Sequence, residues 1–115
     1  MRVLLVEPGK APRGADIGDG LEAMKTVVGG LIQAVYPFEE PVALVCSDEG
    51  KLLGLPPNRA LRDPETGIPY DVVAGTFFLC AAPPDSESFG SLSEEQIARY
   101  ADDFRRPELS TEAEA

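Results

Sequence analysis

The feature that most constrains this chain is a short apolar run at residues 42–46, Val-Ala-Leu-Val-Cys. A run of this length that is rich in β-branched side chains is typical of a strand buried on both faces. The turn-forming residues 47–50, Ser-Asp-Glu-Gly, follow it, and Gly50 can take a positive φ there. The sequence therefore predicts a central strand over 42–46, with residues 51–53 returning as the second arm of a hairpin.

Three other segments carry a strand signal, at residues 2–7, 31–36 and 74–81. Gly75, inside the last of these, indicates a bulge or a close approach of backbone. Loops are expected over 8–18 and over 62–69, because both segments are rich in proline and glycine. The second loop is long enough to act as a flap over a site.

Two helices are predicted from apolar residues that recur at helical spacing. The first covers residues 20–28, with Asp19 as its N-cap and Gly29-Gly30 closing it. The second follows a capping-box pattern formed by Ser93 and Gln96 and ends before Pro107. Its apolar stripe consists of Ile97, Tyr100, Ala101 and Phe104.

These elements predict an α+β fold, with a small mixed or antiparallel sheet of four to five strands and both helices on one face. A chain of 115 residues suits one domain, which we assign to residues 1–106. Residues 107–115 are small and acidic and are predicted to form a disordered tail. Because so small a sheet has edges to hide, a homodimer or higher oligomer is expected.

Composition limits the chemistry and the partners. The formal net charge is −10, and direct nucleic-acid binding is not expected because it depends on Lys and Arg. The chain has no histidine, so it lacks Ser/His and Cys/His dyads and has too few ligands for zinc. Cys46 and Cys80 lie in apolar runs and are expected as buried free thiols. No catalytic residue, metal or cofactor is predicted.

Candidate binding residues lie around the central turn. Asn58 and Arg59 follow two prolines where a single helical turn is expected to start, so amide and guanidinium groups can converge on a phosphate or carboxylate. Aromatic rings just before the central strand can stack on a base, and the turn adds two carboxylates. The predicted ligand-binding residues are Tyr36, Phe38, Asp48, Glu49, Asn58 and Arg59.

A purely structural role for the same side chains is the alternative. Asn58 would then satisfy turn backbone, and Arg59 would pair with an acid such as Asp48 or Glu49. The aromatic side chains would pack in the core.

Several ordered blocks resemble a known family. They are Val28-Gly29-Gly30, Tyr36-Pro37-Phe38, Val42 to Cys46 with Asp48-Glu49-Gly50-Lys51, Leu55 to Ala60, and Ala74 to Phe78. The chain is similar, over roughly residues 1–104, to small uncharacterised proteins of bacteriophages and conjugative elements of mostly Gram-positive bacteria. Ser47 departs from the asparagine expected there, and both residues serve in such turns.

The resemblance implies an accessory protein of a phage or mobile element, acting in counter-defence. The favoured hypothesis is a non-enzymatic protein that binds and sequesters a small nucleotide such as an immune signalling molecule. A second hypothesis is an acidic interaction protein or DNA mimic that blocks a host defence enzyme, and a third is a nucleotide-cleaving enzyme. With no apolar run near the ~18 residues that cross a bilayer and no signal peptide, the expected location is the cytoplasm of the host bacterium.

Overall fold

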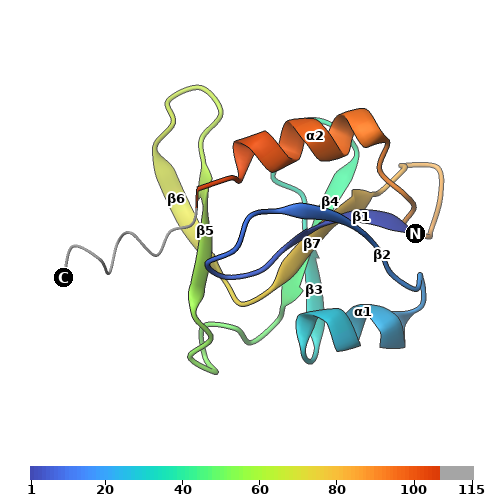
Figure 1. Cartoon of the computed structure of the whole chain (residues 1–115), viewed down its shortest axis with the longest axis horizontal. Helices are drawn as coiled ribbons and strands as arrows, with labels where there is room; N and C mark the ends of the chain where they lie inside the picture. The colour runs from blue at the N-terminus through green and yellow to red at the C-terminus, as the bar shows by residue number, and fades with distance from the viewer. Residues whose placement is uncertain (107–115) are drawn as a thin grey trace.

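The computed structural model describes residues 1–106, and within them two antiparallel sheets are combined with two helices (Figure 1). The elements are β1 (Arg2–Val6), β2 (Arg13–Asp16), α1 (Leu21–Val28), β3 (Ile32–Val35), β4 (Val42–Ser47), β5 (Pro57–Arg62), β6 (Pro69–Ala74), β7 (Phe77–Ala81) and α2 (Glu94–Asp103). The larger sheet has the order β2-β1-β7-β4-β3, while β5 and β6 pair separately. The predicted α+β class is confirmed. The predicted tail, residues 107–115, lies outside the described residues.

The apolar run at 42–46 forms most of β4, and every residue of this strand is buried. β4 lies between β3 and β7, and β7 in turn pairs with β1. Side chains alternate across these strands, so Leu44 and Leu79 face one layer of the core while Val45 and Phe78 face the other. The prediction of a central strand buried on both faces is confirmed.

The two helices cover opposite faces of the larger sheet (Figure 1). Ile97 and Tyr100 of α2 pack on the layer that contains Leu44, whereas Met24 and Val28 of α1 pack on the opposite layer. The prediction that both helices share one face is therefore wrong. Because the central strands carry apolar side chains in both directions, each face needs its own cover.

Three of the four helix ends agree with the predicted caps and end residues. Ser93 Oγ accepts a hydrogen bond from Gln96 N at 3.1 Å, and the Gln96 side chain accepts one from Ser93 N at 3.0 Å, which confirms the capping box. α2 ends at Asp103, with Phe104 as its C-cap, and α1 ends at Val28, with Gly29 as its C-cap at a φ of 95°. The N-cap of α1 is Gly20 rather than Asp19, because the helix begins one residue later than predicted.

Residues 51–53 form a turn rather than the second arm of a hairpin, because both edges of β4 are already paired. Gly54, with a φ of 73°, takes the left-handed conformation expected at Gly50. Gly50 is instead close to β6, since a Cβ placed there would lie 2.8 Å from the carbonyl oxygen of Ala74. Gly75 has a φ of 83° and lies close to the Leu55 side chain. It belongs to the connection between β6 and β7, because the strand predicted over 74–81 begins only at Phe77.

Three paired segments, β2, β5 and β6, were not predicted as strands. β2 lies within the predicted loop 8–18 and pairs with β1. β5 begins at Pro57, where a helical turn was predicted, and pairs with β6 to form a hairpin. Proline is tolerated at this position because it is the first residue of an edge strand, where its missing N–H costs no ladder hydrogen bond. No helix in residues 1–106 is long and apolar enough to cross a membrane.

The hairpin and α2 share one face of the larger sheet. Leu61 and Val73 of the hairpin belong to the same core cluster as Ile97 and Tyr100 of α2. Phe104 joins them, with its ring centroid 5.7 Å from that of Phe77 on β7. This arrangement leaves spaces on either side of the hairpin, one towards β3 and one towards the end of α2.

Substituting Phe104→Ala should lower the free energy of unfolding by ~3 kcal/mol, since it removes a buried aromatic ring and leaves a cavity. Urea denaturation monitors this change. Leu52→Ala is the matched control, because Leu52 is 84% exposed and its truncation should change stability by less than ~0.5 kcal/mol. Equal effects of the two substitutions would show that α2 does not dock as described.

Candidate functional site

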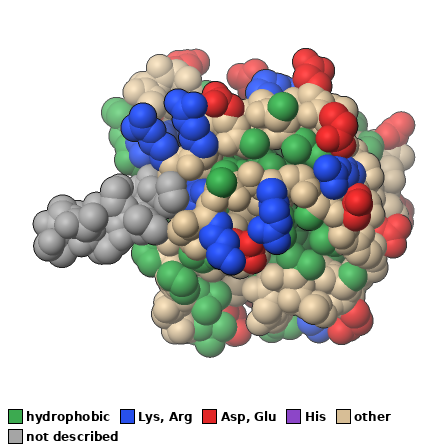
Figure 2. Space-filling view, viewed as in Figure 1, with side chains coloured by type: hydrophobic (Ala, Val, Ile, Leu, Met, Phe, Trp, Pro, Cys, Tyr) green, Lys and Arg blue, Asp and Glu red, His purple; other side chains and the backbone are tan. Residues whose placement is uncertain are grey.

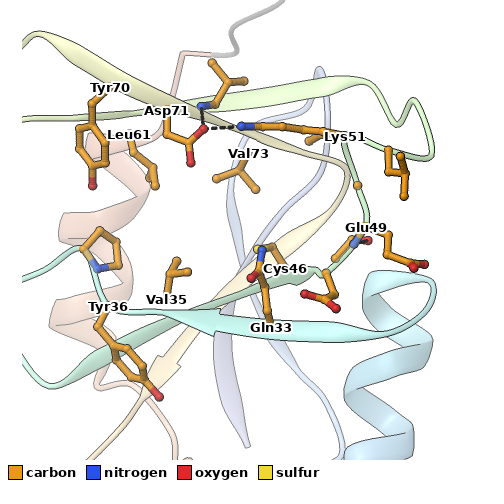
Figure 3. Close-up of a pocket in the computed structure, with 17 residues that line it drawn as sticks. Gln33, Val35, Tyr36, Cys46, Glu49, Lys51, Leu61, Tyr70, Asp71 and Val73 are labelled. Atoms are coloured by element: carbon orange, nitrogen blue, oxygen red, sulfur yellow. Dashed lines mark hydrogen bonds and ion pairs between the residues drawn. The ribbon is translucent and has the colours of Figure 1, made fainter.

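A pocket of about 430 Å³ lies between the hairpin and the β3–β4 edge of the larger sheet (Figure 3). Its lining comes from β3, β4, the turn after β4, and β6. Tyr36 and Tyr70 belong to this lining, and we call the space the tyrosine pocket. A cavity of this volume is in the range of small-molecule sites.

Two tyrosine rings are exposed at this pocket. Tyr36 follows β3 and is 62% exposed, and Tyr70 lies on β6 and is 60% exposed. Figure 3 shows them coming from opposite sides of the pocket, one from the larger sheet and one from the hairpin. An exposed ring offers a flat apolar surface with a polar tip, which suits stacking on another planar group.

An ion pair crosses one wall of the pocket. Lys51 Nζ donates a hydrogen bond to Asp71 Oδ1, which joins the turn after β4 to β6 (Figure 3). The hydrogen bond from Lys51 holds the pKa of the Asp71 carboxyl below its usual value. Asp48 and Glu49 add two further carboxylates to the lining, so acidic groups outnumber the single ammonium group.

The lining of the pocket also contains a thiol, from Cys46, and an amide, from Gln33. Cys46 is 6% exposed, and burial raises the pKa of its thiol, although a hydrogen bond with Gln33 opposes that shift. A thiol with a raised pKa is protonated at neutral pH and is a weak nucleophile. Cys80 is also buried and free, so the prediction of two buried free thiols is confirmed.

The segment that carries Tyr36 and Phe38 is fixed to α2 through Glu40. Tyr100 Oη donates a hydrogen bond of 2.6 Å to Glu40 Oε1, and Arg99 lies 3.0 Å from the same oxygen. Hydrogen bonds from Arg99 and Tyr100 hold the pKa of the Glu40 carboxyl below its usual value. The aromatic segment before β4 therefore has a defined position.

A second cavity, of about 770 Å³, lies between the hairpin and the end of α2. We call it the arginine pocket, because four arginine side chains line it: Arg59, Arg62, Arg105 and Arg106. In the described part of the chain, four carboxylates line it as well: Glu39, Asp63, Asp102 and Asp103. The two pockets adjoin, since both include Tyr70 in their lining.

The structure divides the six predicted binding residues among three places. Tyr36, Asp48 and Glu49 line the tyrosine pocket, and Phe38 and Arg59 line the arginine pocket. Phe38 also packs in the core, with its ring centroid 4.8 Å from that of Tyr100. Asn58 is in the interior, with no exposed surface.

Asn58 and Arg59 hold backbone carbonyl oxygens from distant segments. Asn58 Nδ2 donates hydrogen bonds to the oxygens of Val6, at 3.0 Å, and Gly75, at 2.8 Å. Arg59, 1% exposed, donates from Nε to Phe104 O and from Nη2 to Lys10 O, each at 2.5 Å. Arg59 Nη1 also donates to Asn58 Oδ1 at 2.8 Å. Ligand binding by these two residues stays a prediction.

Sequence reasoning missed Tyr70, Lys51, Asp71 and Gln33 as pocket residues. Tyr70 and Asp71 were missed because β6 was not predicted. A usable signal was present, since residues 63–67, Asp-Pro-Glu-Thr-Gly, separate two segments that contain apolar residues and are typical of a hairpin connection.

The fold and the pockets define a small α+β protein with an open, acidic, tyrosine-lined cavity beside an arginine-lined one. The chain belongs to the family described as Domain of unknown function (DUF3846), whose model matches residues 1–105. The predicted membership of an uncharacterised family is thus confirmed. No curated protein and no solved structure matches the chain.

Replacing Arg59 with alanine should lower the free energy of unfolding by at least ~3 kcal/mol, because it leaves several buried carbonyl oxygens without a charged donor. Arg59→Lys should recover only part of this loss, since an ammonium group cannot reproduce the fork of donors. Denaturant melts measure both changes. Arg13→Ala is the control, because Arg13 forms an exposed ion pair with Glu7 that is worth at most ~1 kcal/mol. Native-like stability of Arg59→Ala would contradict a structural role.

Proposed function

We propose that this protein is a non-enzymatic nucleotide-binding protein whose tyrosine pocket holds the base of a small nucleotide ligand. The observation that carries the proposal is the pair of tyrosine rings, each about three-fifths exposed, at one pocket. Stacking of a base on an aromatic side chain is worth ~1–3 kcal/mol and tolerates different bases. The Tyr70 ring extends towards the larger sheet, whereas the Tyr36 ring points away from the hairpin (Figure 3), so either ring can provide a stacking surface at the pocket.

The polar groups of the same pocket can form hydrogen bonds with the edge of a base or with a sugar. The carboxylates of Asp48 and Glu49 and the amide of Gln33 offer hydrogen-bond acceptors to exocyclic amino groups and to ribose hydroxyls. The Lys51–Asp71 pair is positioned to offer both signs of charge to a ligand. Bases with an amino group should therefore bind more tightly than bases without one.

Two titration properties of the pocket support binding without cleavage. The raised pKa of Cys46 disfavours a thiolate nucleophile, and the lowered pKa of Asp71 makes this carboxylate a weak general base. A bound ligand should accordingly be released unchanged. The enzyme hypothesis predicts the opposite result, which is recovery of a cleaved ligand.

The biological setting follows from the resemblance to proteins of phages and mobile elements. We place the protein in the host cytoplasm, where it sequesters a nucleotide immune signal as a counter-defence factor. The edge strands β2 and β3 of the larger sheet support assembly into a homo-oligomer. The net charge of −10 supports a second candidate, an acidic protein that mimics DNA and blocks a host enzyme.

The direct test is isothermal titration with AMP, GMP, cyclic dinucleotides, 3′-cyclic ADP-ribose and NAD. Tyr36→Ala and Tyr70→Ala should each weaken the tightest ligand by ~1–3 kcal/mol, which is about 5- to 150-fold in Kd. Tyr36→Phe and Tyr70→Phe should retain most of the affinity because the ring remains. Mass spectrometry should recover the ligand unchanged.

Leu31→Ala is the matched control, because Leu31 is exposed but lines neither pocket. If no nucleotide binds more tightly than ~100 μM, or if the tyrosine variants bind like the wild type, the proposal is wrong. Recovery of a cleaved ligand would favour the enzyme hypothesis. An inhibition of DNA-binding enzymes that weakens steeply with salt would favour the mimic.

A further inference from the structure

The tyrosine pocket and the arginine pocket form one continuous binding surface around Tyr70. Both cavities are lined by Pro37, Leu61 and Tyr70, so these residues make up the ridge between them. The exposed ring of Tyr70 therefore borders both spaces. A ligand that stacks on this ring can extend into the second cavity.

The two cavities differ in charge. The tyrosine pocket has three carboxylates, from Asp48, Glu49 and Asp71, and one ammonium group from Lys51, which is paired with Asp71. Among residues 1–106, the lining of the arginine pocket includes four guanidinium groups and four carboxylates. A phosphate is therefore repelled from the first cavity and finds its donors in the second, where guanidinium groups can bind it with paired hydrogen bonds.

The arginine side chains at the end of α2 are accessible. Figure 2 shows Lys and Arg side chains over the region where the hairpin approaches this end of the helix. Arg105 lies 3.1 Å from Asp102 in an ion pair whose side chains are 64% and 70% exposed. An exposed pair of this kind is worth ~0–1 kcal/mol, so a phosphate can compete for the guanidinium group. Arg106 lines the same cavity and is also exposed.

Arg59 has a different part in this cavity. Its guanidinium group is hydrogen-bonded to the carbonyl oxygens of Lys10 and Phe104 and is almost fully buried. Its part in this cavity is therefore structural, while Arg105 and Arg106 supply the exposed guanidinium groups.

We propose that the ligand is a nucleoside phosphate that spans both cavities. Its base stacks in the tyrosine pocket, its sugar passes Tyr70, and its phosphate groups bind Arg105 and Arg106 in the arginine pocket. This inference rests on the proposed function and adds the class of ligand to it. The tyrosine pocket has a volume of about 430 Å³ and the arginine pocket about 770 Å³. The phosphate end therefore has the larger cavity, with space for more than one phosphate group.

The experiment compares adenosine, AMP and ADP, and guanosine, GMP and GDP, by isothermal titration. With the wild type, the diphosphate should bind at least ~10-fold more tightly than its nucleoside. The double variant Arg105→Gln/Arg106→Gln should reduce this advantage to less than ~3-fold while the nucleoside affinity stays unchanged. Added NaCl should weaken the diphosphate much more than the nucleoside.

Arg13→Gln is the matched control, because Arg13 lies on β2, is exposed and lines neither pocket. It removes one positive charge from the chain and should leave every affinity unchanged. The melting temperature of each variant confirms that it is folded.

Two results would overturn the inference while the proposed function stands. One is equal binding of nucleoside and diphosphate by the wild type, and the other is wild-type binding of the diphosphate by the double variant. Nucleoside binding that is insensitive to Tyr36→Ala and Tyr70→Ala would instead overturn the proposed function. If neither nucleosides nor their phosphates bind, both proposals fall.

Discussion

The buried pair Asn58 and Arg59 holds together parts of the chain that are remote in sequence. Asn58 bridges the end of β1 and the residue after β6, and Arg59 links the β1–β2 connection to the C-cap of α2. Both donors start from β5, so the hairpin is attached to the larger sheet by hydrogen bonds as well as by Leu61 and Val73. In residues 1–106, every buried side-chain polar atom has a hydrogen-bond partner. A network that is fully satisfied in this way favours one arrangement of the hairpin.

The position of the hairpin in turn creates both cavities. The tyrosine pocket exists because β6 approaches the turn after β4, where Gly50 permits close contact with Ala74. The arginine pocket exists because β5 faces the end of α2. Folding and ligand binding therefore depend on the same buried contacts, and a substitution at Arg59 changes stability before it can report on binding. The exposed residues Tyr36, Tyr70 and Arg105 are better probes of function.

Much of the fold could be predicted from local patterns. The run at 42–46 specifies a doubly buried strand by composition alone, and Ser93 with Gln96 specifies the start of α2 by spacing. β2 could not be predicted from its own residues, Arg-Gly-Ala-Asp, because it is a short edge strand with little apolar content. Its pairing with β1 is a contact between segments that local propensity does not encode.

The candidate site was only partly predictable for the same reason. Tyr36, Asp48 and Glu49 are close in sequence to the central strand, and the structure places all three at one pocket. Tyr70 reaches that pocket through β6, and its role depends on how the hairpin packs. The sequence around Arg59 indicates a guanidinium near a turn, but its burial depends on the carbonyl oxygens of Lys10 and Phe104, far away along the chain.

The most direct test of the account is a ¹H–¹⁵N NMR titration of the full chain with ADP. Nucleotide binding across the two cavities predicts that the largest shift changes occur at the backbone amides of Tyr36, residues 48–51, Tyr70 and Asp71, with a second group at Arg105 and Arg106. The amides of α1, on the opposite face of the sheet, should change little. Changes concentrated on α1, or an unchanged spectrum at millimolar ADP, would contradict the account.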